Sequence, residues 1–279
     1  MSDKKLQIKD FEKNNYFATQ ELVDVVNAAL FLDKPLLIEG PAGTGKTYLA
    51  KSLSNMLSKE LIRLQCHEGI DEDKAIYEWD YKKQLLSIQN DKNEKDLFTD
   101  EYLIERPILK SLKTSDSLFL VDEIDRSDEE FEALLLEVLA EKQVTIPELG
   151  TVAGEGNNFT ILTSNATRDL SEALRRRCIY FFLDYPSIDI ETKVILSNVE
   201  SISEEKAKKY SLFSSFIRKL NLNKPPSLIE TVEWVKYNHE NNHEELDSNI
   251  GILIKDIDDQ KLYKEKLKEN NDFKNGSVT

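Results

Sequence analysis

The sequence has little of the residue types on which disulfide scaffolds and metal centres depend. Its 279 residues include two cysteines, Cys66 and Cys178, which stand far apart and form no C-x-x-C motif. They give no disulfide framework, so we expect a reduced, cytoplasmic environment. Of the three histidines, His239 and His243 have the i, i+4 spacing of a metal-binding pair. Because they lie in the very polar stretch YNHENNHEEL, we interpret them as part of a solvated surface.

Long hydrophobic runs and an excess of basic residues are also missing. No apolar segment approaches the length of a transmembrane helix, and the start, MSDKKLQIKDFEKNN, has no apolar signal-peptide region. We therefore expect no stable membrane insertion. The formal net charge of −15 argues against a nucleic acid bound through an open basic face. The 40% of hydrophobic residues is nevertheless enough for a core in one large domain or two smaller ones.

The order of apolar and amphipathic segments predicts an α/β fold. The first fifteen residues are polar and are expected to be frayed, and ATQELVDVVNAALFL then has the pattern of an amphipathic helix with Thr19 as N-cap. Short apolar runs such as KPLLIEG, ELIRLQC and LFLV alternate with helical patterns after that. This alternation predicts a mostly parallel sheet between helices. The charged and aromatic stretch from 67 to 96 is interpreted as an insertion.

The pattern changes after Pro186. From there to about residue 269 it is helical throughout, and we expect an α/β domain over residues 1–186, a smaller all-helical domain over 187–269 and a disordered tail over 270–279. Two S-x-x-E capping boxes are predicted, one at Ser127 and Glu130 and one at Ser227 and Glu230.

The segment GPAGTGKT matches the phosphate-loop pattern G-x-x-x-x-G-K-[ST] in full. Its glycines allow backbone N–H groups to turn toward phosphate oxygens, its lysine neutralises the β- and γ-phosphates, and its last hydroxyl can bind Mg²⁺. The motif follows a predicted strand and opens a predicted helix, as this mechanism requires. The predicted nucleotide-binding residues are Gly40, Pro41, Ala42, Gly43, Thr44, Gly45, Lys46 and Thr47.

Two adjacent acids end the apolar run LFLV. Buried charge is costly unless it is neutralised, and a phosphate-loop domain needs an acid at the tip of a neighbouring strand to hold magnesium. Asp122 and Thr47 are the predicted magnesium ligands, and Glu123 is the predicted base that polarises the attacking water. The alternative, that the acids merely lead a helix, is weaker because Ser127 and Glu130 are expected to cap it. Asp125 and Arg126 are expected to form a surface pair or a subunit contact.

Two further stretches carry candidate catalytic residues. Asn165 ends the run ILTSN, where its amide could orient the attacking water or sense the γ-phosphate, although asparagine at a strand end is commonly a turn residue. The segment ALRRRC offers Arg175, Arg176 and Arg177. They either favour the end of a short helix or supply an arginine finger, and the residue types alone do not choose among the three.

The phosphate-loop motif, the pair of acids, the asparagine at a strand end and the arginine segment occur in this order. In this the chain resembles the AAA+ ATPases, and the MoxR family in particular. The resemblance covers nearly the whole length and is closest to the branch that accompanies aerobic carbon monoxide dehydrogenase and other molybdenum hydroxylases. It is carried by LLIEGPAGTGKT, CHEGIDEDKAIYEWDYKKQLL, FLVDEIDRSDEEFEALLLEVLAEKQVTIPELGT, LTSNATRDLSEALRRRCIYFFLDYP and KPPSLIETVEW.

The resemblance implies a P-loop AAA+ core with a five-stranded sheet and a helical lid. It implies a Walker A motif at residues 40–47, a Walker B motif ending at Asp122 and Glu123, and sensor 1 at Asn165. Arg177 falls at the position of the arginine finger, with Arg176 as a close rival. One departure stands out: KPPSLIETVEW has no sensor 2 arginine, so either Lys224 substitutes or the lid contacts nucleotide differently.

The family also implies ATP and Mg²⁺ as cofactors and a homo-oligomeric ring, usually a hexamer. Its members commonly act as maturation chaperones beside a partner with a von Willebrand A-type domain. We therefore expect an ATPase that remodels a partner protein, such as a molybdenum or copper metalloenzyme. The alternatives are a P-loop kinase, which leaves the arginines and the helical lid unexplained, and a nucleic-acid-dependent motor, which the acidic composition disfavours.

Overall fold

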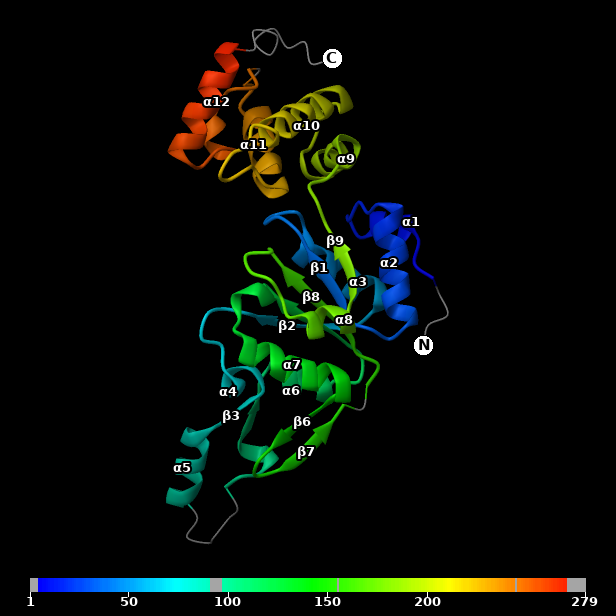
Figure 1. The fold of residues 1–279 in the computed structure, drawn as a ribbon, viewed down its shortest axis with the longest axis vertical. Coiled ribbons are helices and arrows are strands. Elements are labelled where there is room, and N and C mark those ends of the chain that lie inside the picture. Colours follow the sequence, from blue (N-terminus) through cyan, green and yellow to red (C-terminus); the bar gives the residue numbers. More distant parts are fainter. Residues whose placement is uncertain (1–4, 91–96, 155, 244, 270–279) are drawn as a thin grey trace. The chain divides into compact units, whose positions relative to one another are not determined.

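The computed structural model describes residues 5–90, 97–154, 156–243 and 245–269, which form two compact units (Figure 1). The first unit comprises the residues up to Asp10, Thr19–Gly40 and Lys46–Phe182. The second comprises Phe11–Ala18, Pro41–Gly45 and the chain from Leu183 onward. In the part of the chain described, no helix is long and apolar enough to span a bilayer. The predicted disordered tail, 270–279, lies outside the described residues.

A five-stranded sheet, parallel throughout, forms the centre of the first unit. Its strand order is β2-β5-β8-β1-β9. The strands are β2 (Glu60–Gln65), β5 (Ser117–Asp122), β8 (Phe159–Ser164), β1 (Leu36–Glu39) and β9 (Ile179–Phe182). The parallel sheet between helices confirms the predicted fold class. Because all strands run the same way, the residues that follow β1, β5 and β8 meet at one edge.

Helices cover both faces of this sheet. The helices are α2 (Gln20–Phe31), α3 (Lys46–Leu57), α6 (Pro107–Lys113), α7 (Glu129–Glu141) and α8 (Glu172–Arg177). One apolar cluster joins residues of α6, α7 and α8 to alternate strand residues such as Leu37, Phe119 and Leu162. The intervening residues, among them Leu36 and Leu120, are also fully buried and point to the other face, where α3 packs against β2, β5 and β8.

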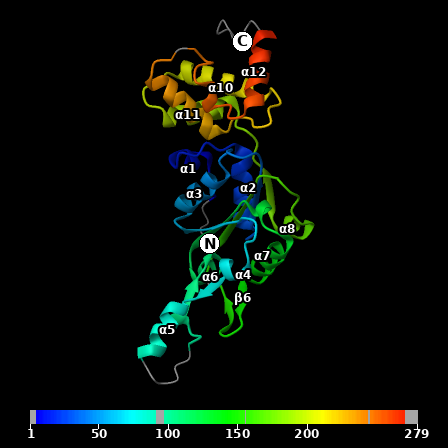
Figure 2. The same cartoon turned by 90° about the vertical axis from the view of Figure 1, so that its left-hand side faces the viewer.

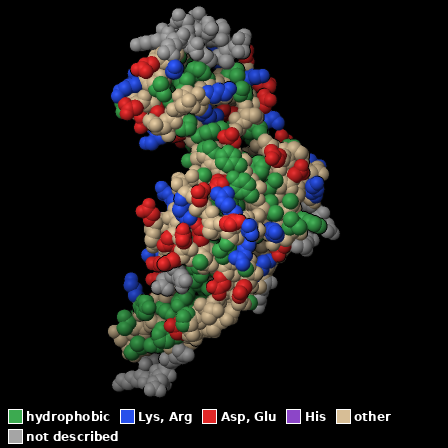
Figure 3. All heavy atoms as spheres, in the orientation of Figure 1, with side chains coloured by type: hydrophobic (Ala, Val, Ile, Leu, Met, Phe, Trp, Pro, Cys, Tyr) green, Lys and Arg blue, Asp and Glu red, His purple; other side chains and the backbone are tan. Residues whose placement is uncertain are grey.

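Two antiparallel pairs extend the first unit. Strand β3 (Tyr77–Trp79) pairs with β4 (Leu103–Glu105), and β6 (Gln143–Ile146) pairs with β7 (Gly150–Ala153). Strand β3, with the short α4 (Glu72–Ala75) and with α5 (Tyr81–Asn90), lies in the stretch predicted as an insertion, whereas its partner β4 lies beyond that stretch. Figures 1 and 2 both place α5 far from α2. Hydrophobic side chains gather over α5 on the face seen in Figure 3.

Two local predictions are wrong and two are confirmed. The prediction of a frayed start is wrong for residues 8–13, because α1 (Ile8–Lys13) forms there and buries Phe11. The N-cap of α7 is Asp128, whose side chain accepts from the backbone N–H of Phe131. Ser127 instead donates to the carbonyl of Ile124, because a 3₁₀ turn precedes the helix. Thr19 caps α2, and the second capping box, at the start of α11 (Leu228–Glu240), is present.

The second unit is helical. Besides α11 it contains α9 (Ile188–Asn198), α10 (Glu204–Arg218) and α12 (Ile257–Glu269). Trp234 of α11 is fully buried and stacks on Phe213, with ring centroids 5.4 Å apart. Replacing a buried tryptophan by alanine lowers the free energy of unfolding by about 3–5 kcal/mol. The apolar cluster around Trp234 and Phe213 therefore holds the helices of this unit together.

Candidate functional site

The predicted phosphate loop follows β1 and leads into α3. Gly43 and Gly45 have φ of 74° and 97°, in the left-handed region that side chains with a Cβ rarely adopt. Lys46 begins α3, is buried, and donates from Nζ to the carbonyl of Gly40 over 2.7 Å. Burial lowers the pKa of this ammonium, although the carboxylates of Asp125 and Asp122 oppose the shift. The N-terminus of α3 thus follows a left-handed, glycine-shaped turn, which is the local geometry that anion binding requires.

Asp122 lies at the carboxyl end of β5, beside the start of α3. The hydroxyl of Thr47 donates to its carboxylate, at 3.1 Å from Oδ1 and 3.2 Å from Oδ2. The hydroxyl of Thr163, on the neighbouring β8, also donates to Oδ1. A carboxylate and a hydroxyl oxygen therefore lie together, and oxygens of this kind are the ligands that Mg²⁺ takes beside a phosphate loop. The residues present fit that ion.

Glu123 follows Asp122 in the left-handed conformation, with φ 56° and ψ 50°. Its backbone N–H donates to Oγ1 of Thr163 over 3.0 Å, which fixes the turn. The side chain is partly exposed, and its Oε1 lies 3.5 Å from Nδ2 of Asn165. The structure therefore brings Thr47, Asp122, Glu123 and Asn165 to one edge of the sheet.

Asp125 corrects a sequence-based expectation. It is not a surface residue, because only 3% of it is exposed. Its Oδ1 accepts from the backbone N–H of Asn165 at 3.1 Å, and its Oδ2 accepts from the backbone N–H and the hydroxyl of Thr167. Arg126 does lie at the surface, where its guanidinium forms an ion pair with the carboxylate of Glu123 over 3.5 Å. Asp125 thus holds the loop that carries Asn165.

Arg63 was not predicted as part of the site. Its guanidinium donates to Oδ2 of Asp122 from Nε at 3.0 Å and from a terminal nitrogen at 2.6 Å. Half of the Arg63 side chain is exposed, whereas 2% of Asp122 is exposed. Only the pairing of β2 with β5 brings Arg63 to the acid, and this pairing is not visible in the sequence. One sequence signal pointed to Arg63. It and Gln65 are polar residues that alternate with apolar residues in β2, so they share one face of the strand, and both are exposed.

Comparison with known proteins agrees with this geometry. Residues 35–178, about half of the chain, match the AAA domain of the dynein-related subfamily. The chain belongs to this AAA family. The match begins just before β1 and ends after α8, so it contains the phosphate loop, both acids, Asn165 and the arginine segment. Membership implies a nucleotide-binding ATPase domain.

Individual relatives of this AAA domain protein are distant. An uncharacterized protein of Staphylococcus epidermidis is 26% identical over 192 residues, which cover 67% of this chain and 68% of the relative. One of Staphylococcus haemolyticus is 28% identical over 190 residues, covering 66% and 68%. A solved structure from Cytophaga hutchinsonii, described as a candidate ATPase, is 18% identical with a TM-score of 0.49. That likeness covers 76% of this chain and 66% of the other, just under two thirds of its length.

The three adjacent arginines of α8 differ in their surroundings. Arg175 donates from both terminal nitrogens to the carboxylate of Glu39. Arg176 pairs with Glu172 on its own helix and is largely exposed. Arg177 is exposed and, among the residues that the structure describes, has no hydrogen bond or ion pair. Neither Arg176 nor Arg177 is brought to Asp122 or Glu123 within this chain, and of the three only Arg177 has its guanidinium unengaged.

The second unit has one arginine close in sequence to the start of α11, where the AAA+ resemblance places a sensor 2 arginine. This residue, Arg218, makes contacts inside the unit. Arg218 forms a buried ion pair with Glu191 and donates to the carbonyl of Pro226. Its guanidinium is therefore occupied inside the unit. The proposed substitution of a sensor 2 arginine by Lys224 stays a prediction.

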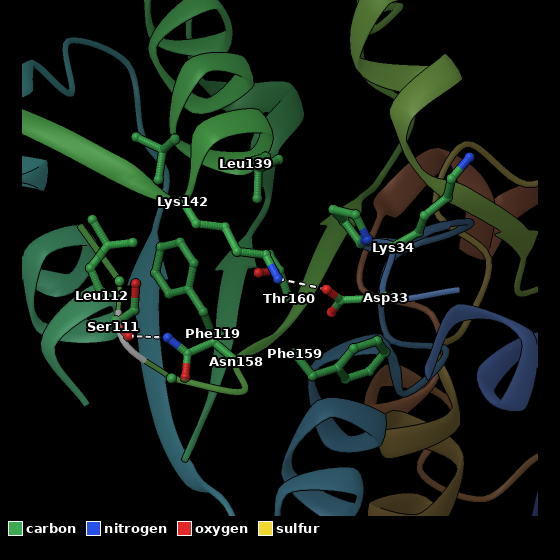
Figure 4. A pocket seen from close by; sticks show the side chains of 14 residues that line it. Asp33, Lys34, Ser111, Leu112, Phe119, Leu139, Lys142, Asn158, Phe159 and Thr160 are labelled. Carbon is green, nitrogen blue, oxygen red and sulfur yellow. Dashed lines mark hydrogen bonds and ion pairs between the residues drawn. The ribbon is translucent and has the colours of Figure 1, made fainter. Parts of the chain in front are cut away.

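A small cavity in the first unit lies away from these residues. Its lining includes Lys34, Phe119, Lys142 and Phe159, and Lys142 forms an ion pair with Asp33 at 2.6 Å (Figure 4). Its volume is about 50 Å³, far below that of an ordinary small-molecule site. It lies near the beginnings of β1 and β8, whereas ligands of open α/β sheets bind beyond the carboxyl ends. It is not the candidate nucleotide site.

Proposed function

We propose that this protein is an ATP-hydrolysing ring ATPase of the MoxR type that remodels or matures a partner protein. The observation that carries the ATPase part is the grouping of Thr47, Asp122, Glu123 and Asn165 at one edge of the sheet. Thr47 donates to Asp122, Thr163 bridges Asp122 to the backbone N–H of Glu123, and the Glu123 carboxylate lies 3.5 Å from the Asn165 amide. Such a grouping supplies oxygen ligands, a base and an orienting amide at one point, beside the glycine-rich loop.

In this proposal the loop binds the phosphates of ATP through its backbone N–H groups, and Lys46 provides the main side-chain counter-charge. Thr47 and Asp122 would hold Mg²⁺, which screens the charge of the phosphate oxygens when bound. Thr163 orients Asp122 by donating to Oδ1.

Glu123 accepts the proton of the attacking water, and Asn165 donates to that water or to the γ-phosphate. The 3.5 Å separation of their side chains is long for a direct hydrogen bond, and a small shift would let each contact the substrate. Arg177 is proposed to act as the finger of a neighbouring subunit, because it is exposed and unpaired among the described residues.

The chaperone role rests on the resemblance of long stretches, such as CHEGIDEDKAIYEWDYKKQLL, to the MoxR family. We propose a hexameric ring, a partner with a von Willebrand A-type domain and a metalloenzyme client, of the kind served by the branch that accompanies carbon monoxide dehydrogenase. The domain division at residue 186 and the cytoplasmic location belong to the same proposal.

Assembly provides the test. A finger in trans makes hydrolysis depend on ring formation, so specific activity should rise with protein concentration and then level off. Arg177→Ala should bind ATP without hydrolysing it, since a finger mainly stabilises the transition state.

Arg177→Ala subunits keep an intact base, and Glu123→Gln subunits keep an intact finger. Mixing them should restore part of the activity, with co-assembly checked by native mass spectrometry. Co-assembled rings without recovery would exclude Arg177 as a trans finger and leave Arg176 or a cis role.

A further inference from the structure

An ion pair with a buried carboxylate connects the end of β1, directly before the phosphate loop, to the arginine segment. Glu39 ends β1 and directly precedes the loop, and only 5% of it is exposed. Arg175 of α8 donates to its two oxygens at 3.1 and 2.9 Å, in a fork geometry. Tyr180 of β9 donates from its hydroxyl to Oε2 at 2.9 Å, and the centroid of its ring lies 5.7 Å from the guanidinium carbon of Arg175.

This arrangement fixes two elements that are distant in sequence. A single bond lets a side chain swivel, but two parallel N–H···O bonds fix the plane of the guanidinium. Glu39 is also anchored as part of a fully buried strand. Arg175 is therefore immobilised against β1, and Arg177 lies two residues further along the same short helix.

Removing one partner of such a pair is costly, because a charge would stay buried without compensation. Here only Glu39 is deeply buried, whereas a third of the Arg175 side chain is exposed. The carboxylate therefore depends on Arg175 and Tyr180 more than Arg175 depends on the carboxylate.

We propose that Glu39 and Arg175 are positioning residues that hold α8 so that Arg177 is presented to the neighbouring subunit. The inference rests on the proposed ring ATPase and on Arg177 as its finger. Glu39 and Arg175 touch no substrate in this proposal, and the chemistry at a subunit's own loop does not need them.

The test uses the variant Glu39→Gln, in which the side chain keeps its shape but loses its negative charge. We expect its ATP affinity, measured by titration, to stay within about twofold of wild type. Hydrolysis should fall at least about tenfold, because misplacing a catalytic group by an ångström costs on the order of a hundredfold.

Mixed rings then locate the defect. Glu39→Gln subunits have a sound site and a misplaced finger, so Glu123→Gln subunits, with sound fingers, should restore activity. Arg177→Ala subunits have no finger to offer and should not. The opposite pattern, with recovery only beside Arg177→Ala, would show that Glu39 serves its own loop and would overturn the proposal.

Glu172→Gln is the matched control, because it breaks the other arginine–glutamate pair of α8 without touching β1. It should hydrolyse ATP at the wild-type rate, and loss of hydrolysis there would mean that any disturbance of α8 is enough. If Glu39→Gln does not fold, Arg175→Lys takes its place in the same mixing scheme, because lysine keeps a positive charge beside the buried carboxylate but loses the two-bond fork. A wild-type protein without ATPase activity would refute the proposed function itself, whereas an active wild type with an unimpaired Glu39→Gln variant refutes only this inference.

Discussion

Asp125 holds Asn165 through the backbone: its Oδ1 accepts from the Asn165 N–H at 3.1 Å, while Oδ2 accepts from Thr167. The Asp125 carboxylate therefore fixes the backbone of the loop that follows β8. The side chain of Asn165 takes no part in these bonds and can face Glu123. An acid that looks like part of a surface pair in the sequence is a structural support of the candidate site.

Asp125→Asn should destabilise the protein and slow hydrolysis together. An amide keeps one acceptor oxygen but loses the charge, and hydrogen bonds to charged groups contribute about 1.5–3 kcal/mol each. Urea unfolding and steady-state turnover measure the two effects. A variant with normal stability and normal turnover would refute this supporting role.

The Asp125 contribution should also depend on pH. Burial alone would raise the pKa of this carboxyl, but hydrogen bonds from Thr167 and Asn165 outweigh it and hold the pKa below its usual range. The unfolded chain then binds protons at higher pH than the folded one, so the contribution is fully present above about pH 5 and declines below about pH 4. The difference in unfolding free energy between wild type and Asp125→Asn should shrink over that range, and a constant difference would contradict the assignment.

Lys46→Ala should lose measurable ATP affinity. In the proposed phosphate loop this ammonium is the main side-chain counter-charge for the β- and γ-phosphates, and nothing else in the loop carries a positive charge. Titration with a fluorescent ATP analogue measures the loss, with Lys51→Ala, one turn further along α3 and exposed, as control. Unchanged affinity in Lys46→Ala would remove the basis for a phosphate loop.

Glu123→Gln should keep the fold and ATP binding but slow hydrolysis by about 10²–10⁴, since an amide cannot accept the proton. Single-turnover hydrolysis and a thermal melt separate the two effects. Wild-type turnover would show that another group is the base.

Arg63 should compete with magnesium for Asp122. Its guanidinium lies 2.6 Å from Oδ2, so Arg63→Met should tighten Mn²⁺ binding several-fold in the presence of ADP, as electron paramagnetic resonance would show. Arg63→Lys keeps the positive charge and serves as control. Weaker binding in Arg63→Met would instead mean that Arg63 orients Asp122 toward the ion.

Much of the fold follows from local patterns in the sequence. The glycine loop, the strand tips at Asp122 and Asn165, and the capping box at Ser227 depend on neighbours in the chain, and short motifs encode these. The N-cap at Asp128 was missed because Ser127 offered an equally good cap one residue earlier, and only the preceding 3₁₀ turn decides between them.

The partners of the site residues are harder to predict. Arg63 reaches Asp122, and Arg175 reaches Glu39, across 59 and 136 residues of chain. These contacts depend on which strands become neighbours, and the apolar runs of the five strands do not specify the order of the strands in the sheet. The sequence therefore indicated which residues are candidates but not which ones hold them in place.

Stability and the proposed chemistry favour different residues at position 123, where the backbone is left-handed. A residue with a Cβ is strained there by about 1 kcal/mol, and glycine or asparagine would relieve the strain. Neither could act as a base. Selection for thermal resistance alone would therefore favour the loss of this glutamate, and its proposed role as the base would be the reason to keep it despite the strain.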